Sequence, residues 1–468
     1  MAHPVGITGL TAVWKWRRTF MCPRIFVLAL CLELIQAQPT ATNPGTPLLR
    51  ADPEVGLVDV PVRITVSGLH AKQLVRITAT SRTSTDRALL SYAVFRADES
   101  GNIDVGTAKP IEGTYSKADP MGLFWSMAPQ PVPVEVWRLL DLPPFWPPKP
   151  WTVLLEVAPE QGGSALAKLK LVRLYATEGV RSLDVRDGGL VGKLMLPAQS
   201  AASRGPGVIR LGGSEGGLDE AGAALLASHG YVALSLAYFG IEGLPSDLVE
   251  IPVEYSIRAL EWLQARPEID PDRIAIIGGS RGSELALLTA SFRPDVRSVV
   301  AMGPSGVVWG GIPKSPRPSP VAAWTYEGKP LPFLSAKAPS ELMQEFYAKG
   351  PLQSRLYDFL FSDAKAVEQA TIPIERIHGQ VLLISGKEDR VWGSPIMAQR
   401  IMDRAQQFDR AGSFSNISYE GAGHNIREPY RPTPAQSRLG GTAEAHARAE
   451  QDSWQKILAF LERTLEKR

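Results

Sequence analysis

Residues 273–292 have the sequence RIAIIGGSRGSELALLTASF, in which an apolar run, a glycine-rich turn and a helical pattern follow one another. The run at 274–277 is rich in isoleucine and predicts a buried strand. The turn at 278–282 has the form G-x-S-x-G, which provides the small residues that a serine needs where the backbone turns tightly from strand to helix. Such a turn exposes a hydroxyl at the amino end of a helix, where free N–H groups favour negative charge. We therefore predict that Ser280 is a nucleophile.

Two other interpretations of this stretch are weaker. A glycine-rich turn can belong to a nucleotide-binding fold, but the glycines at 212–217 are not in a dinucleotide-binding arrangement, and no Lys-Ser or Lys-Thr follows them. Ser283 is another nearby hydroxyl, but it would lie inside the helix. Ser280 therefore remains the candidate nucleophile.

A serine nucleophile needs a general base that a third group holds in place. Of the six histidines, His424 lies in the glycine-rich loop at 420–425, between the last predicted strand and the last predicted helix. Asp389 follows another predicted strand and is preferred as the acid over its neighbour Glu388. The order serine, aspartate, histidine, with each member at the carboxyl end of a strand, is that of α/β hydrolases. We predict a catalytic triad of Ser280, Asp389 and His424.

Backbone N–H donors are expected beside the nucleophile, because acyl transfer places negative charge on the carbonyl oxygen of the substrate. One donor should be the N–H of Arg281, directly after Ser280. The other is expected from the loop GGSEGG at 212–217, which follows a predicted strand, and we assign it to Ser214. The sequence thus predicts an oxyanion hole made by Arg281 and Ser214.

The pattern of apolar residues changes near residue 179. Before it, apolar and polar residues alternate in short runs, as in half-buried antiparallel strands. After it, apolar strands alternate with helical patterns, which is typical of a mostly parallel sheet covered by helices. The predicted helices are at 219–228, 253–265, 282–292, 394–408 and 442–465. The predicted organisation is a targeting segment at 1–37, a linker at 38–50, an antiparallel β-sandwich domain at 51–178, and an α/β-hydrolase domain at 179–468 with a Pro-rich capping insertion at about 303–373.

The first residues have features of a targeting segment. Four basic residues between 15 and 24 precede an apolar run at 25–32, and Ala37 offers a small residue for cleavage. Arg17 and Arg18 also resemble a twin-arginine export signal. We expect a periplasmic or secreted protein. A mitochondrial presequence and a translation start at Met21 stay open as alternatives, and a misinterpreted segment would leave a mitochondrial or cytoplasmic protein.

Composition excludes several functions. A net charge of +2 gives no general reason to expect nucleic acid as a partner. Both cysteines, Cys22 and Cys31, lie near the start, which excludes a disulfide framework, a thiolate metal site and a cysteine nucleophile in the remaining chain. No run is long and apolar enough to span a membrane in the mature protein. We expect no metal and no cofactor, and the oligomeric state is not indicated.

Short runs in both halves of the chain resemble one enzyme family. They are VDVPV at 58–62, MGLFWSM at 121–127, GGL at 216–218, LAY at 236–238, ELALLTASF at 284–292, and Asp389 followed by Trp392. Over about residues 50–468 the chain resembles the acyl-CoA thioesterases and bile acid-CoA:amino acid N-acyltransferases. The resemblance implies a β-sandwich packed on an α/β-hydrolase domain, and a long-chain acyl thioester as substrate. It also implies serine at the elbow in thioesterases and cysteine in acyltransferases, so Ser280 favours hydrolysis.

The expected function is hydrolysis of fatty acyl-CoA through an acyl-enzyme intermediate. An exported carboxylesterase or lipase-like hydrolase is the main alternative, because an exported protein would not meet acyl-CoA, an intracellular metabolite. An acyl-CoA:amino acid N-acyltransferase and a non-catalytic binding protein are weaker alternatives. The insertion carries many large apolar residues, and we expect Trp324 and Phe333 among them to line an acyl pocket. The alternative, that these residues only pack the insertion onto the sheet, stays open.

Overall fold

The computed structural model describes residues 46–82, 88–129, 149–198, 204–315, 317–335, 338–351, 354–433 and 439–467. The predicted targeting segment at 1–37 lies outside these residues, as does most of the predicted linker. The prediction that the linker extends to residue 50 is wrong, because strand β1 (Leu48–Asp52) begins before that point. Leu49 and Ala51 are buried on one side of this strand, so it already belongs to a folded sheet.

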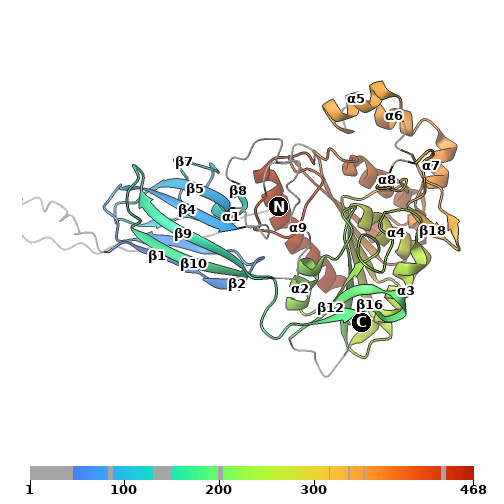
Figure 1. Cartoon of the computed structure of the whole chain (residues 1–468), viewed down its shortest axis with the longest axis horizontal. Helices are drawn as coiled ribbons and strands as arrows, with labels where there is room; N and C mark the ends of the chain where they lie inside the picture. Colours follow the sequence, from blue (N-terminus) through green and yellow to red (C-terminus); the bar gives the residue numbers. More distant parts are fainter. Residues whose placement is uncertain are drawn as a thin grey trace, which may run out of the picture. The chain divides into compact units, whose positions relative to one another are not determined.

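The first part of the chain forms two sheets whose strands are nearly all antiparallel. The three-stranded sheet has the order β1, β3 (Arg63–Ser67) and β6 (Ile103–Asp104). The larger sheet has the order β2 (Val55–Leu57), β10 (Ala167–Leu174), β9 (Trp151–Pro159), β4 (Leu74–Arg82), β5 (Ala88–Arg96) and β7 (Glu112–Gly113), and β8 (Ala128–Pro129) also pairs with β5. Strands β2 and β10 run parallel. The pairing of β4, β5, β9 and β10 is visible in Figure 1.

Alternate residues of these strands form one core between the two sheets. Ile64 from the smaller sheet and Ile77, Phe95 and Leu155 from the larger sheet are completely buried in the same cluster. The short helix α1 (Gly122–Trp125) packs into it. The two-residue period of the sequence is therefore confirmed, and an antiparallel sheet region precedes the catalytic fold as predicted.

An eight-stranded sheet follows. Its order is β11 (Arg181–Val185), β12 (Val191–Leu196), β14 (Val232–Ala237), β13 (Gly205–Leu211), β16 (Ile269–Gly279), β17 (Ser298–Met302), β20 (Gln380–Gly386) and β21 (Phe414–Tyr419). Strands β11 and β12 are antiparallel to their neighbours, and all pairs from β14 to β21 are parallel. This is the predicted α/β-hydrolase architecture.

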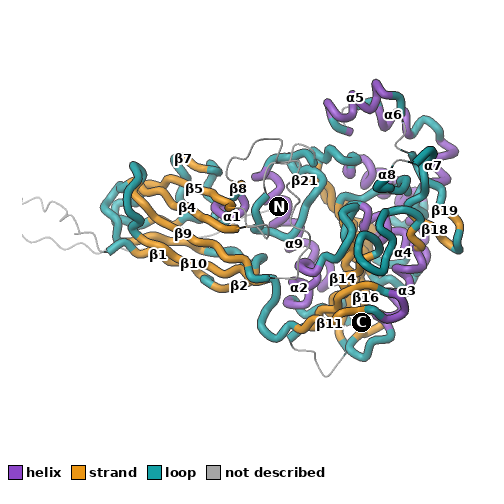
Figure 2. The backbone as a smooth tube through the Cα atoms, viewed as in Figure 1, coloured by secondary structure: helices purple, strands orange, loops and turns teal. Residues whose placement is uncertain are grey.

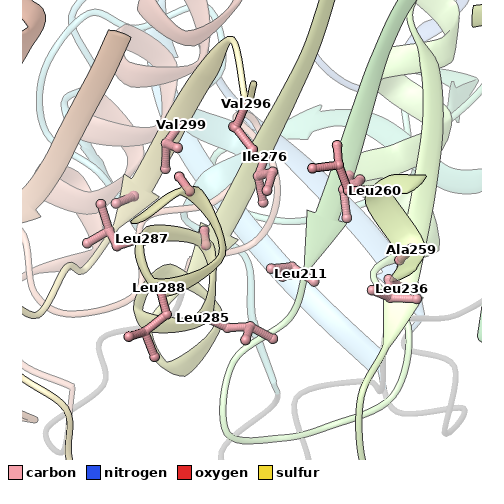
Figure 3. Close-up of a cluster of buried hydrophobic side chains, with 14 of the residues drawn as sticks. Leu211, Leu236, Ala259, Leu260, Ile276, Leu285, Leu287, Leu288, Val296 and Val299 are labelled. Atoms are coloured by element: carbon pink, nitrogen blue, oxygen red, sulfur yellow. The ribbon is translucent and has the colours of Figure 1, made fainter. Parts of the chain in front are cut away.

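Helices cover both faces of this sheet because neighbouring strand residues point to opposite faces. Ile276 and Val299 share one core with α3 (Val253–Gln264), α4 (Arg281–Phe292) and α8 (Ser394–Gln407), part of which Figure 3 shows. Ile277 and Val300 share the opposite core with α2 (Glu220–Ser228) and α9 (Ala443–Thr464). All five helices agree with their predicted positions to within one residue at each end.

The predicted capping insertion lies between β17 and β20 and is called the cap below (residues 303–373). Much of it is loop (Figure 2). Its regular elements are β18 (Trp324–Tyr326), β19 (Lys329–Pro330), α5 (Ser340–Lys349), α6 (Leu356–Leu360) and α7 (Ala364–Ala370), and β18 pairs with β15 (Ile251–Pro252). Short 3-10 turns occur at Asp187–Gly189, Ile374–Arg376 and Ala411–Ser413. The cap starts at the carboxyl end of β17, next to β16, which leads into Ser280.

No helix among the described residues is long and apolar enough to cross a membrane.

Candidate active site

Ser280, His424 and Asp389 form a continuous chain of hydrogen bonds. His424 Nε2 is 2.8 Å from Ser280 Oγ, and His424 Nδ1 is 2.8 Å from Asp389 Oδ2. Asp389 is 1% exposed, so its carboxylate faces the imidazole and not the solvent. With Nδ1 donating to the carboxylate, Nε2 is free to accept the proton of the serine hydroxyl. The structure thus brings together the three residues predicted from sequence.

The backbone at Ser280 is strained, as a strand-to-helix elbow requires. Ser280 has φ 52° and ψ −118°, and positive φ is uncommon for a residue other than glycine. A Cβ on Gly278 would lie 2.1 Å from the carbonyl oxygen of Gly282, and one on Gly282 would lie 2.2 Å from that of Gly212. Both contacts are with backbone, which cannot move aside. The turn therefore needs glycine at both positions.

Asp389 is held in one orientation by backbone donors. Its Oδ1 accepts from the N–H of Val391 at 2.7 Å, and its Oδ2 accepts from the N–H of Ser394 at 3.1 Å. Burial opposes ionisation of this carboxyl, but His424 and these donors together lower the pKa of Asp389 below its ordinary value. The alternative acid, Glu388, is exposed. Asp389 can therefore stay ionised and orient the imidazole.

Two further residues that the sequence analysis did not assign to the site support His424. The Trp392 ring meets the His424 ring edge-on with centroids 5.5 Å apart, and its Nε1 donates to Gly303 O at 3.1 Å. His446 on α9 is buried, and its Nε2 accepts from the N–H of Gly423 at 3.1 Å. Only the place of Trp392 three positions after the acid hinted at its role. That of His446 depends on a contact 23 residues away.

The predicted oxyanion donors lie beside the nucleophile. Ser214 and Arg281 both line the cavity that Ser280 lines. Within the part of the chain that the structure describes, neither backbone N–H donates to another residue. The Tyr238 hydroxyl lies 2.8 Å from Gly212 O and 3.1 Å from the carbonyl oxygen of the next residue, and burial raises the pKa of Tyr238 well above its ordinary value. A protonated Tyr238 therefore fixes the direction of the loop that carries Ser214.

A cavity of about 550 Å³ opens at Ser280. Its walls come mainly from the cap and are mostly apolar. The lining residues include Trp309, Gly310, Ile312, Pro313, Pro320, Val321, Met343, Phe346, Tyr347, Leu356, Tyr357 and Leu360 of the cap, and Val391 and Trp392 beside the acid. Arg317 is exposed at this cavity. The site can therefore hold an apolar chain with its reacting carbonyl at Ser280.

The predicted pocket residues Trp324 and Phe333 do not line this cavity, and that assignment is corrected. Trp324 is completely buried, and its Nε1 donates to Glu284 Oε1 at 2.6 Å. Phe333 packs against the core beside Gly310. A buried indole is stable inside the protein when its N–H donates to a carboxylate, because its polar group is then satisfied. The size and hydrophobicity of a cap residue alone do not show whether it lines the cavity or packs into the core.

Among the described residues no cluster of His, Cys, Asp and Glu side chains could hold a metal ion.

Comparison with known proteins relates both halves of the chain to one family. Residues 251–467 match the model described as BAAT / Acyl-CoA thioester hydrolase C terminal, and residues 59–187 match the model described as Acyl-CoA thioester hydrolase/BAAT N-terminal region. Among solved structures, a puromycin-hydrolysing peptidase of Mycobacterium tuberculosis is 14% identical with a TM-score of 0.43, covering 87% of this chain and 59% of that chain.

Two curated relatives from Mus musculus have different activities in their names. The chain is 30% identical over 436 residues to acyl-coenzyme A amino acid N-acyltransferase 2, covering 89% of this chain and 97% of that protein. It is also 30% identical over 469 residues to mitochondrial acyl-coenzyme A thioesterase 2, covering 97% of this chain and 95% of that protein. These two matches extend over nearly the whole chain, and the N-terminal and C-terminal models of the same family match its two halves in that order. The chain belongs to the family of acyl-CoA thioester hydrolases and bile acid-CoA:amino acid N-acyltransferases.

Proposed function

We propose that the protein is an acyl-CoA thioesterase that hydrolyses fatty acyl thioesters through a covalent acyl-enzyme on Ser280. The observation that carries the proposal is the hydrogen-bonded chain Ser280–His424–Asp389 at the wall of a mostly apolar cavity. Nucleophile, base and acid occur in the roles that acyl transfer needs, and the cavity provides room for an apolar acyl group.

In the first half-reaction, Ser280 Oγ attacks the thioester carbonyl carbon while His424 Nε2 takes the hydroxyl proton. The tetrahedral oxyanion accepts hydrogen bonds from the N–H groups of Arg281 and Ser214, each typically worth about 3 kcal/mol in the transition state. The C–S bond then breaks, and His424 returns the proton to the leaving thiolate. Asp389 stabilises the imidazolium throughout.

In the second half-reaction, water replaces the thiol. His424 takes a proton from the water, the resulting hydroxide attacks the acyl carbonyl, and the C–O bond to Ser280 breaks as His424 returns the proton to Oγ. The products are the fatty acid and the regenerated serine. Serine at the elbow supports water as acceptor, since the family resemblance associates cysteine with transfer to an amino acid.

A carboxylesterase is the second candidate, and the export-like residues before 38 favour it. An oxygen ester would use the same attack, oxyanion hole and acyl-enzyme. The two proposals differ only in the leaving group and in where the protein meets its substrate.

The purified protein should be assayed with palmitoyl-CoA and with p-nitrophenyl palmitate under identical conditions. Thioesterase function predicts a kcat/KM for palmitoyl-CoA in the range of ordinary enzymes, about 10⁴ M⁻¹s⁻¹ or more. Turnover of the p-nitrophenyl ester with no release of CoA would overturn the thioesterase proposal in favour of the esterase. A test with glycine or taurine as acceptor should give free palmitate and no amide.

A further inference from the structure

Directly after the nucleophile in the chain, the structure buries an ion pair whose side chains the proposed chemistry does not use. Arg281 and Glu284 lie one turn apart on α4, and their side chains are 4% and 0% exposed. Arg281 Nη1 is 2.9 Å from Glu284 Oε2. Neither side chain hydrogen-bonds to Ser280, His424 or Asp389.

Both members of the pair are bonded to the cap. Arg281 Nη2 donates to the carbonyl oxygens of Trp309 at 3.1 Å and of Gly310 at 3.0 Å. Glu284 Oε1 accepts from the N–H of Trp309 at 3.1 Å and from Nε1 of Trp324 at 2.6 Å. The guanidinium also lies 5.8 Å from the centre of the Trp324 ring. The pair therefore attaches one short cap segment to the first turn of α4.

That cap segment is part of the cavity wall. Trp309 and Gly310 line the cavity, and the Trp309 ring meets the Tyr357 ring edge-on at 6.3 Å. The Tyr357 hydroxyl donates to the carbonyl oxygen of Trp392, whose ring contacts His424. A continuous wall thus runs from the helix that begins directly after Ser280 to the imidazole that activates it.

Stability alone does not account for a pair of this kind. Apolar residues of the same volume often stabilise a core as well as a buried ion pair or better. What an apolar pair cannot do is donate hydrogen bonds to two carbonyl groups and accept them from two N–H groups at once. The planar guanidinium is suited to this task because its donors have fixed directions.

We propose that Arg281 and Glu284 are positioning residues that fix the Trp309–Gly310 wall against Ser280 and thereby set the acyl-chain length that the enzyme selects. This inference rests on the proposed function in taking an acyl chain as the occupant of the cavity. A long acyl chain contacts more of the cavity wall than a short one, so it loses more buried apolar contact when the wall moves. A short acyl group, held near the nucleophile, loses less.

The test uses a series of p-nitrophenyl esters from acetate to palmitate. Arg281→Met combined with Glu284→Gln removes both charges, so that no unpaired buried charge remains to unfold the protein. The ratio of kcat/KM for palmitate to that for acetate should fall about tenfold or more, mainly through KM of the long ester. Arg281→Lys should recover part of the ratio, since an ammonium keeps the charge but not the planar set of donors.

Arg404→Met combined with Glu375→Gln is the matched control. That pair is joined by two hydrogen bonds, at 2.7 Å and 3.1 Å, and neither residue lines the cavity. The ratio of kcat/KM for palmitate to that for acetate should stay within about twofold of the ratio in the natural protein. A folded double variant at 281 and 284 with an unchanged ratio overturns the proposal. So does an equal loss of kcat for all chain lengths, which would mean that the pair serves Ser280 and not the wall.

The wall proposal and the proposed function can fail separately. Ester turnover without palmitoyl-CoA turnover removes the thioesterase proposal and leaves the length test intact. If no ester is turned over, binding of hexanoate, dodecanoate and palmitate to the Ser280→Ala protein is measured by tryptophan fluorescence. Affinity should increase steeply with length, and the added double substitution should flatten that increase. An equally steep increase in both proteins overturns the wall proposal.

Discussion

At the residue scale, the elbow illustrates how a local pattern can predict a strained conformation. The spacing of Gly278, Ser280 and Gly282 carried the prediction, and the structure explains it through two backbone contacts that leave no space for a Cβ. The sequence alone does not determine whether Asp389 or its neighbour Glu388 is the acid. The choice depends on which side chain turns inward, and backbone donors several residues later determine that.

The elbow offers a matched pair of substitutions. Gly282→Ala would place a Cβ 2.2 Å from Gly212 O, whereas a Cβ on Gly279 meets nothing within 4 Å. We expect Gly282→Ala to lower the free energy of unfolding by about 1–3 kcal/mol or more and to abolish activity. Gly279→Ala should keep the protein folded. Urea unfolding monitored by circular dichroism measures both, and equal stabilities of the two variants would contradict this view of the turn.

The acid offers a test of orientation. Asp389→Asn preserves the size of the side chain but presents an uncharged group to His424 Nδ1. The wrong tautomer of the His424 imidazole is then favoured, in which Nε2 is not free to accept the proton of Ser280. The value of kcat should fall by about 10³–10⁴-fold. Glu388→Gln, at the exposed neighbouring position, should change kcat less than about twofold. An Asp389→Asn enzyme with nearly full activity would show that another group orients the imidazole.

At the element scale, the strands and helices that pack locally were predictable and those that depend on distant partners were not. Helix α4 was identified from its own sequence. Strand β11 was not, because RSLDV has no alternating apolar face and four of its five residues are exposed. The burial of Trp324 was missed for a different reason, since its partner Glu284 lies 40 residues away.

Helix α5 provides the outer wall of the cavity without contributing to the core. Phe346 and Tyr347 line the cavity, and none of the helix residues is buried. Phe346→Ala should therefore leave the melting temperature within about 2 °C while lowering kcat/KM for palmitoyl-CoA more than for acetyl-CoA. Gln344→Ala, on the same helix but outside the cavity lining, is the control and should change neither.

Trp324→Ala should behave in the opposite way. Its indole is completely buried and hydrogen-bonded, so we expect a loss of about 3–5 kcal/mol in the free energy of unfolding. Chemical denaturation at pH 7 measures it. A stable Trp324→Ala protein with an altered chain-length profile would return this residue to the pocket.

At the scale of the whole molecule, the alternation of strands and helices was enough to predict the α/β-hydrolase sheet, and the alternation of apolar and polar residues was enough to predict the antiparallel region before it. The buried charges around Arg210 were not predictable. Arg210 bonds to Asp219 at 2.6 Å and to Glu428 at 2.9 Å, and these residues are separated by up to 218 positions. Nothing in a local pattern of charges shows that they meet inside the protein.

Glu450 makes this buried region sensitive to pH. Burial raises the pKa of Glu450 to about 7, with Glu428 adding to the rise and Arg427, Thr433 and Arg431 opposing it. A raised carboxyl pKa gives stability that is fully present below about pH 4.5 and is lost as the pH rises through 7. The free energy of unfolding of Glu450→Gln, taken relative to that of the natural protein, should increase by up to about 3 kcal/mol between pH 5 and pH 8.

The control for this substitution is Glu462→Gln, exposed on the same helix α9. Its unfolding free energy should follow the natural protein at both pH values. A Glu450→Gln protein whose stability relative to the natural one does not change with pH would mean that the carboxyl is ionised without cost.

The central claim is that Ser280 becomes acylated, and peptide mass spectrometry tests it most directly. The protein is mixed with palmitoyl-CoA, quenched in acid within the first turnovers and digested. A palmitoyl group should be found on the peptide of residues 273–292 and assigned to Ser280. It should be absent from the Ser280→Ala protein. It should persist in the Ser283→Ala protein, because the natural Ser283 hydroxyl donates to Ser280 O and is not the nucleophile. Acylation of Ser280→Ala at another residue with turnover retained would contradict the claim.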